Sequence, residues 1–473
     1  MKDDMRVPKS LLVIGNGFDL SCGLPSNYLS FLTSILSSKI NSKESEVIEK
    51  IKQGLRNYIE KYEHFWIDSP QKLTTITDDN NRFILDLNIW YLLFVYKDMI
   101  HDINWYLIED QIASELLGDH NNLNIVEKIG DTLLGIYRGE GNYVGRKNRL
   151  YCRTKTNTYD EENLIDKIYE LFAYCLLHKN LGSLDRNNKA VFQELRDTVQ
   201  RLGDEYKELS SQNKINRSPY FETFEQKIIS VLFPLVAQAL LAELNELEGD
   251  FRNYLRGCTS TSIITYTENA ESHFRHILEP VNADRGDNDI VDFNILSFNY
   301  TTPWDNYRAP WETPNNKIFE KVFDSINIHG KISNSDGIIF GIDDEKIAPT
   351  QNEFIFSKVS RTLDLITLSN HRKNFEALLS INIENVVFYG HSLSIADYGY
   401  FRMIFDKYIE NSEVKFYFTF IVYEGTTEDK ERKKLIKNIS ELFGKYSIDK
   451  EKNTDIFKKL IQNQRIEIIS LSI

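Results

Sequence analysis

One predicted strand stands near the N-terminus, far along the chain from every other predicted strand. The apolar run Leu11–Ile14 ends at Gly15, which is the pattern of a buried parallel strand. Pro25 and Ser26 then open a predicted helix with apolar residues at helical spacing. Because strand patterns return only at Asp292, the first strand is expected to join a sheet built from the far end of the chain.

The long stretch between these strands is helical in pattern. Segments between residues 41 and 279 carry apolar residues at helical spacing and contain little glycine. The expected helices are Ser42–Tyr62, Arg82–Leu117, Ile125–Tyr137, Glu161–His178, Lys189–Glu208 and Tyr220–Leu255. From Asp292 onward strands alternate with helices, which is typical of a parallel sheet. The expected strands are Phe293–Phe298, Ser325–Ile328, Gly337–Gly341, Asn385–Tyr389, Val414–Tyr423 and Arg465–Leu471, with helices at Ala396–Ile409 and Lys430–Phe443.

These patterns predict an α/β fold with a doubly wound, mostly parallel, Rossmann-like sheet that a large all-helical insertion interrupts. The first strand, turn and helix would occupy residues 1–40, the insertion residues 41–285, and the remainder of the α/β domain residues 286–473. One interrupted sheet explains the lone N-terminal strand better than two separate α/β domains do.

Composition narrows the class of protein. The net charge of −14 argues against a global basic field that would grip nucleic acid. The longest apolar stretches, Ile89–Tyr96 and Val231–Leu244, fall short of the roughly 20 residues of a membrane span, and no signal-peptide pattern is visible. The four cysteines are scattered, without a C-x-x-C pair. We therefore expect a soluble cytoplasmic protein with reduced thiols, no metal site and no membrane partner.

A glycine-rich turn, Gly15-Asn16-Gly17-Phe18-Asp19, follows the first strand. Glycines let a ligand approach the backbone closely, and a helix N-terminus favours phosphate. The third glycine of the dinucleotide-binding fingerprint is missing, because Leu20 stands at its place. Asp19 is a candidate for contact with ribose hydroxyls. The alternative is a tight structural turn that Asp19 caps.

Three later strand ends carry polar residues as well. Asn299 ends one predicted strand and offers a donor and an acceptor to a ribose or a water, or it caps the next turn. His329 ends another and is a candidate general base, although a lone histidine is more often structural. In open α/β sheets ligands bind outside the carboxyl ends of the strands, which favours the functional interpretation.

The turn Gly390-His391-Ser392, with Asp397 behind it, is the fourth candidate. A glycine and small polar residues between a strand and a helix suit a ligand-facing turn, but Ser392 and Asp397 are equally suited to cap the helix. Asp343 and Asp344 form a further acidic turn that needs no role beyond solvation.

Together these segments resemble the AbiH family of bacterial phage abortive-infection proteins. The segments that carry the resemblance are Ile14–Asp19, Gly23-Leu24-Pro25, Phe298-Asn299-Tyr300-Thr301, Ile328-His329-Gly330, Ile339–Asp343 and Tyr389–Leu393. The resemblance covers both ends of the chain, and in the helical middle it extends loosely to Trp105 and Glu109.

The same order of motifs is similar to the sirtuin-like fold, which implies NAD as the ligand. The resemblance implies that Asn299 and His329 are the catalytic residues. It implies nucleotide contacts for Gly15, Asn16, Gly17, Phe18, Asp19, Gly23, Leu24, Gly390, His391, Ser392 and Asp397. The turn departs from the sirtuin pattern, and the four-cysteine zinc module is absent, which argues for NAD cleavage rather than protein deacylation.

The resulting hypothesis is an antiphage effector that hydrolyses NAD, used as a substrate, at its nicotinamide–ribose bond. The helical insertion would carry sensing or self-association as a homo-oligomer, with a phage-derived trigger or a partner defence protein. The alternatives are a non-enzymatic nucleotide-binding sensor and an enzyme that acts on another nucleotide or on nucleic acid.

Overall fold

The chain forms two compact units. The computed structural model describes residues 7–61, 82–100, 108–118, 124–138, 161–212, 218–283, 290–305, 318–333, 337–342, 347–368, 375–394, 397–422, 425–450 and 456–471. The α/β unit comprises Met1–Phe31, Gly249–Asp343 and Arg361–Ile473, and the helical unit comprises Leu32–Glu248 and Asp344–Ser360. The first segment of the helical unit therefore ends at Glu248, and the C-terminal part of a long helix belongs to the α/β unit.

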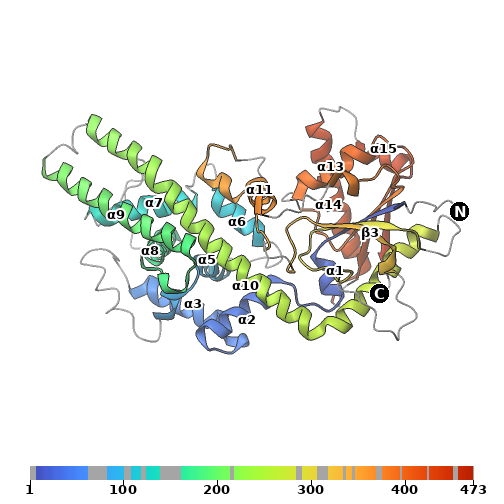
Figure 1. The fold of residues 1–473 in the computed structure, drawn as a ribbon, viewed down its shortest axis with the longest axis horizontal. Helices are drawn as coiled ribbons and strands as arrows, with labels where there is room; N and C mark the ends of the chain where they lie inside the picture. Colours follow the sequence, from blue (N-terminus) through green and yellow to red (C-terminus); the bar gives the residue numbers. More distant parts are fainter. Residues whose placement is uncertain are drawn as a thin grey trace. The chain divides into compact units, whose positions relative to one another are not determined.

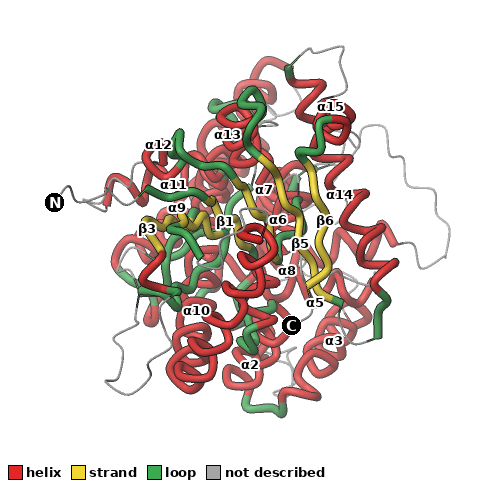
Figure 2. Tube along the Cα trace, turned by 90° about the vertical axis from the view of Figure 1, so that its right-hand side faces the viewer, coloured by secondary structure: helices red, strands yellow, loops and turns green. Residues whose placement is uncertain are grey.

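A six-stranded parallel sheet forms the centre of the α/β unit (Figures 1 and 2). Its strands are β1 (Ser10–Ile14), β2 (Phe293–Ser297), β3 (Val322–Asn327), β4 (Asn385–Tyr389), β5 (Lys415–Ile421) and β6 (Ile466–Leu471). The order is β3-β2-β1-β4-β5-β6, so the chain winds one way from β1 and the other way from β4. This is the strand order of the doubly wound dinucleotide-binding fold, and it confirms the predicted fold class.

The lone N-terminal strand lies at the centre of this sheet. Leu12 pairs with Ile295 of β2 on one side and with Val387 of β4 on the other. All five residues of β1 are buried, as expected of a parallel strand that is covered on both faces.

One predicted strand is wrong. Gly337–Gly341 does not join the sheet; only an isolated antiparallel bridge joins Ile338 to Gly330. The segment folds back on the turn after β3, where the Ile339 N–H donates to the His329 carbonyl at 3.0 Å. Its apolar residues are buried by this packing, so the apolar run that suggested a strand has another cause.

The helices largely follow the predicted segments. Those of the helical unit include α3 (Glu44–Lys61), α5 (Ile89–Ile100), α6 (Ile108–Leu117), α7 (Ile125–Arg138), α8 (Glu161–His178) and α9 (Arg186–Ser211), and α2 (Tyr28–Ile40) leads into them. Those of the α/β unit are α1 (Asn16–Ser21), α12 (Phe375–Leu378), α13 (Tyr398–Tyr408), α14 (Glu428–Asp449) and α15 (Ile456–Gln462). Two helices, α10 (Ser218–Ala283) and α11 (Lys358–Leu368), contribute residues to both units. Helix α10 extends far beyond the predicted end at Leu255 and is kinked at Ser262.

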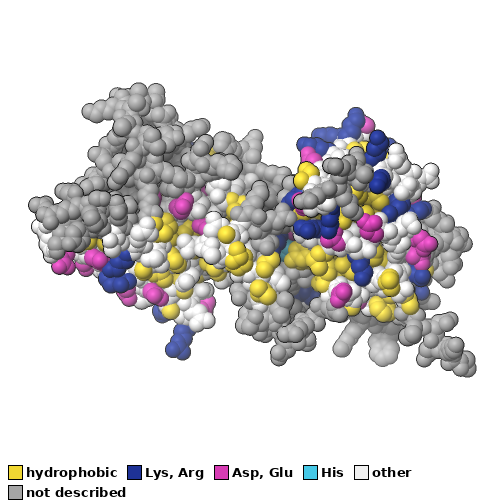
Figure 3. All heavy atoms as spheres, turned by 90° about the horizontal axis from the view of Figure 1, so that it is seen from above, with side chains coloured by type: hydrophobic (Ala, Val, Ile, Leu, Met, Phe, Trp, Pro, Cys, Tyr) yellow, Lys and Arg dark blue, Asp and Glu magenta, His cyan; other side chains and the backbone are white. Residues whose placement is uncertain are grey.

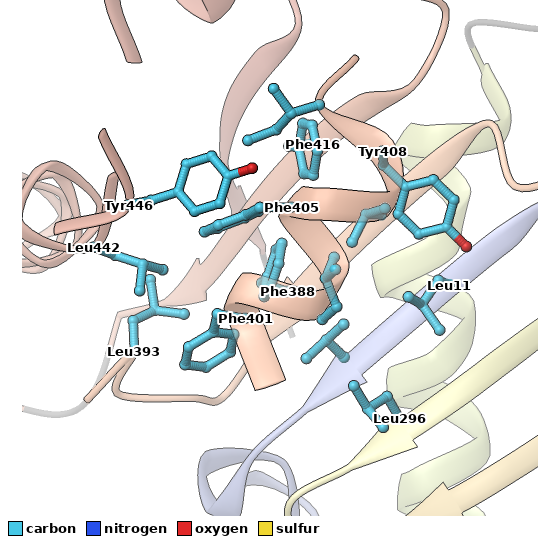
Figure 4. Close-up of a cluster of buried hydrophobic side chains, with 14 of the residues drawn as sticks. Leu11, Leu296, Phe388, Leu393, Phe401, Phe405, Tyr408, Phe416, Leu442 and Tyr446 are labelled. Atoms are coloured by element: carbon cyan, nitrogen blue, oxygen red, sulfur yellow. The ribbon is translucent and has the colours of Figure 1, made fainter. Parts of the chain in front are cut away.

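The core of the α/β unit fixes α13 over the sheet (Figure 4). Phe401 and Phe405 of α13 pack among buried side chains of β4, β5 and α14, and the Phe405 ring stacks on Phe443 at 4.6 Å between centroids. On β4 and β5 the rings of Phe388 and Phe418 stack at 4.7 Å. Because Asp397 directly precedes α13, this packing also fixes the position of Asp397.

One stretch of α10, Gln226–Val281, is long and apolar enough to cross a membrane by length and composition. In its most apolar window 61% of the residues are buried inside the structure, as in a core helix. Figure 3 shows one face of the molecule, on which Lys and Arg side chains lie among Asp and Glu side chains. The cytoplasmic location remains a prediction.

Candidate functional site

The turns after β1 and β4 are in direct backbone contact at the point where the sheet changes winding direction. The Gly15 N–H donates to the Tyr389 carbonyl at 3.1 Å, and the Gly17 N–H donates to the Gly390 carbonyl at 2.8 Å. A Cβ on Gly17 would lie 2.8 Å from the Gly390 Cα. The glycines therefore allow two turns of the protein to meet, and these two N–H groups are already bonded.

The remaining predicted residues of the first turn also have protein partners. Asn16 accepts a hydrogen bond from the Ser26 hydroxyl at 2.5 Å, and the Phe18 ring stacks on Phe274 of α10 at 4.9 Å. Gly23 has a φ of +85°, and the Leu24 N–H donates to the Asp19 carbonyl at 2.9 Å. Contact of these residues with a nucleotide remains a prediction.

Asp19 points into a buried polar network. Its Oδ1 accepts hydrogen bonds from the Tyr266 hydroxyl at 2.8 Å and from Asn299 Nδ2 at 3.1 Å. Its Oδ2 accepts one from the Thr301 hydroxyl at 2.7 Å, and the two hydroxyls lie 2.9 Å apart. The carboxyl therefore holds α1, α10 and the end of β2 together.

Burial raises the pKa of Asp19 from 3.8 to about 6, although its three hydrogen bonds lower it. A count of protons agrees with this direction. The three oxygen pairs formed by Asp19, Tyr266 and Thr301 need three protons, and the two hydroxyls supply only two. A protonated Asp19 supplies the third and closes the ring, so this carboxyl is suited to be neutral in mildly acidic solution.

Asp19→Asn is expected to change how stability depends on pH. Because the folded pKa lies above the unfolded value, wild type gains stability from this group below pH 4 and loses it as the pH rises through about 6. The rise from 3.8 to about 6 corresponds to about 3 kcal/mol. Asparagine keeps the ring of hydrogen bonds but does not titrate. Urea unfolding of both proteins at pH 4 and pH 7.5 measures the difference, and parallel pH curves would contradict this assignment.

The end of β2 presents Asn299 at the same edge of the sheet. The Ser297 hydroxyl accepts a hydrogen bond from the Asn299 N–H at 3.1 Å, which sets the turn. The Asn299 side chain is buried, with its Nδ2 bonded to Asp19 and its Oδ1 without a partner among the described residues. Sequence reasoning missed its neighbour Asn327, whose Nδ2 donates to the carbonyls of Asn299 at 2.7 Å and Thr301 at 3.0 Å.

His329 follows the neighbouring strand β3, and its ring lies near the residues on either side of Asn299. The residues that flank Asn299 are Phe298 and Tyr300, whose rings lie 5.8 and 6.4 Å from the His329 ring. The next residue, Gly330, has a φ of +89°, and a Cβ there would lie 2.5 Å from the Gly337 carbonyl oxygen. This turn therefore requires glycine, and it holds the histidine at the end of β3.

Asp397 joins two histidines from opposite halves of the sheet. His329 Nε2 lies 3.3 Å from its Oδ1, and His391 Nε2 lies 3.2 Å from its Oδ2. Strands β3 and β4 are three positions apart in the sheet, or roughly 14 Å, so the turns after them reach over the ends of β1 and β2. The Phe298 ring contacts both histidines beneath this link.

Hydrogen bonds fix the ring nitrogens of His391. Its Nδ1 accepts the N–H of Leu393 at 2.8 Å, so the proton must be on Nε2, which faces Asp397. Leu393 has a φ of +56°, a conformation that leucine rarely adopts. Strain of this kind gathers at functional sites.

Other predicted residues lie outside this cluster. Ser392 is exposed, and its carbonyl accepts a hydrogen bond from Asn438. Glu109 pairs with Lys358 at 3.2 Å within the helical unit. Trp105, Asp343 and Asp344 fall outside the described residues. Cys22, Cys175 and Cys258 are free thiols, and in the described part of the chain no three His, Cys, Asp or Glu side chains are grouped to hold a metal ion.

A doubly wound parallel sheet with polar side chains at four strand ends defines a Rossmann-like α/β protein. The family model described as bacteriophage abortive infection AbiH matches residues 11–420. The chain therefore belongs to the AbiH family, which indicates an antiphage abortive-infection role. Comparison with curated proteins and with solved structures found no match.

Proposed function

We propose that this protein acts in antiphage defence by hydrolysing NAD at its nicotinamide–ribose bond, at the carboxyl ends of β1 to β4. The observation that supports the proposal is the difference in surroundings between the two ring nitrogens of His329. Its Nε2 faces Asp397, while its Nδ1 is buried and has no partner among the residues that the structure describes. A histidine with one nitrogen held by a carboxylate and the other unbonded is arranged as a general base.

The proposed reaction needs only a water molecule and side chains at the carboxyl ends of the strands. A water oxygen attacks C1′ of the nicotinamide ribose, and its proton passes to His329 Nδ1. The glycosidic bond breaks, its electron pair moves onto the nicotinamide nitrogen, and neutral nicotinamide leaves. The products are nicotinamide, ADP-ribose and a proton. Asp397 stabilises the imidazolium that forms, and Asn299, oriented by Asp19, positions the water or the ribose.

Two features of the structure bear on the fit of NAD. Unpartnered acceptors at the ends of β2 and β3 suit the hydroxyls of a ribose. The glycine turn is less open than in a dinucleotide-binding fingerprint, because the Gly15 and Gly17 N–H groups are bonded to the turn after β4. The proposal therefore places the reacting ribose near Asn299 and His329 rather than the pyrophosphate on the glycines. The helical unit would carry the sensing or self-association that keeps the enzyme silent before infection.

The test is release of nicotinamide from NAD by the purified protein, with and without an extract of phage-infected cells, followed by chromatography. Wild type is expected to release nicotinamide in the presence of the extract, and His329→Ala is expected not to. The matched control is His276→Ala on α10, a partly exposed histidine outside the cluster, which should behave as wild type. Equal release by His329→Ala and wild type would reject the mechanism. Binding of NAD without release under any condition would favour the sensor.

A further inference from the structure

Three buried acceptor atoms belong to residues at the ends of the neighbouring strands β2 and β3. They are Asn299 Oδ1, Asn327 Oδ1 and His329 Nδ1, and none has a hydrogen-bond partner among the described residues. The three residues are 3%, 8% and 3% exposed. Since a buried polar atom without a partner is unfavourable, three at the ends of two neighbouring strands indicate a site built for a ligand.

The other polar atoms of these side chains fix what each free atom can do. Both amide protons of Asn327 are used, because Nδ2 donates to two backbone carbonyls. Asn299 must turn its Nδ2 toward the Asp19 carboxylate, and His329 must keep its proton on Nε2 beside Asp397. The two amide oxygens and the ring nitrogen therefore can only accept hydrogen bonds.

Because these three atoms can only accept hydrogen bonds, they favour a ligand that donates hydrogen bonds. Ionised phosphate offers acceptor oxygens and would leave all three atoms unsatisfied, whereas hydroxyl groups donate. We propose that the two amide oxygens bind the vicinal hydroxyls of a ribose, that Asn327 is a ligand-binding residue that selects for them, and that His329 Nδ1 accepts from the attacking water. This inference rests on the proposed function for the location of the ribose, and it adds that the ligand must carry free 2′- and 3′-hydroxyls.

Binding of ADP-ribose tests the inference without any hydrolysis, because this compound has the ribose but no bond to nicotinamide. Titration calorimetry would compare ADP-ribose with analogues that lack the 2′- or the 3′-hydroxyl of the distal ribose. On wild type at least one analogue is expected to bind roughly tenfold more weakly. The Asn327→Ala variant is expected to bind that analogue as tightly as it binds ADP-ribose. Inorganic phosphate at millimolar concentration should not displace ADP-ribose from wild type.

The matched control is Asn294→Ala at the opposite end of β2. Asn294 is also buried, donates its Nδ2 to the Leu378 carbonyl and has an unpartnered Oδ1. The Asn294→Ala variant should still bind the analogue more weakly than ADP-ribose, as wild type does, because Asn294 is far from the carboxyl ends of the strands. If Asn327→Ala does not fold, the comparison of ligands on wild type still decides.

The outcomes separate this inference from the proposed reaction. Hydroxyl-dependent binding without nicotinamide release supports the ribose site and rejects the hydrolase. Nicotinamide release with equal binding of ADP-ribose and both analogues rejects the ribose site and leaves the hydrolase standing. A lack of ADP-ribose binding, or its displacement by phosphate, also overturns the inference.

Discussion

Gly390→Ala is expected to lower the free energy of unfolding by about 3 kcal/mol or more. Gly390 has a φ of +67°, which L side chains rarely adopt, and a Cβ there would lie 2.4 Å from the Phe18 backbone nitrogen and 2.8 Å from the Gly17 carbonyl carbon. These are backbone atoms, so no side chain can rotate away to make room. The turns after β1 and β4 would have to separate. Urea unfolding followed by circular dichroism measures the change.

The control for this substitution is Gly399→Ala in α13. No atom lies within 4 Å of a Cβ at Gly399, and alanine favours helix by up to about 1 kcal/mol over glycine. Gly399→Ala should therefore leave stability unchanged or raise it. Equal unfolding midpoints for Gly390→Ala and wild type would show that the two turns are not in contact in solution.

Asp397→Asn is expected to slow nicotinamide release by about 10²- to 10⁴-fold, the range of an acid–base group, while the fold remains intact. The His391 proton is fixed on Nε2, so asparagine must turn its oxygen toward His391. Its NH₂ group then faces His329 Nε2, which can no longer carry a proton there. The His329 proton moves to Nδ1 and removes the lone pair that accepts a proton from water.

Asp406→Asn is the matched control for Asp397→Asn. Asp406 lies on the same helix, α13, but is partly exposed and pairs with Lys450 at 2.8 Å. It should keep the wild-type rate of release. A rate for Asp397→Asn within a fewfold of wild type would mean that His329 does not act through Nδ1 as the proposal requires.

The sequence predicted the sheet well because buried parallel strands have a strong local pattern. The apolar runs that end at Gly15, Asn299 and Gly390 became β1, β2 and β4, and the polar residues after them lie at one edge. The run at Gly337–Gly341 was misleading because burial alone makes a segment apolar, and pairing depends on where the neighbouring strands lie.

The partners within the site could not be predicted from the sequence. Tyr266 bonds Asp19 from a helix whose local sequence has no motif, and only the packing of α10 brings it there. Asn327 stands two residues before His329 at the end of a strand, which is a weak signal that could have been used. Asp397 was expected to contact a nucleotide, but its two histidine contacts arise because turns from distant strands meet, which no local pattern reveals.

The central place of β1 also governs when the sheet can form during synthesis of the chain. Residues 10–14 leave the ribosome well before their partners, which are residues 293–297 and 385–389. The first strand therefore waits, unpaired, through most of translation, and such distant pairing is slow to form. A nascent or prematurely ended chain that lacks β4 also lacks His391 and Asp397. Under the proposed function, such an incomplete copy would therefore lack the site that acts on NAD.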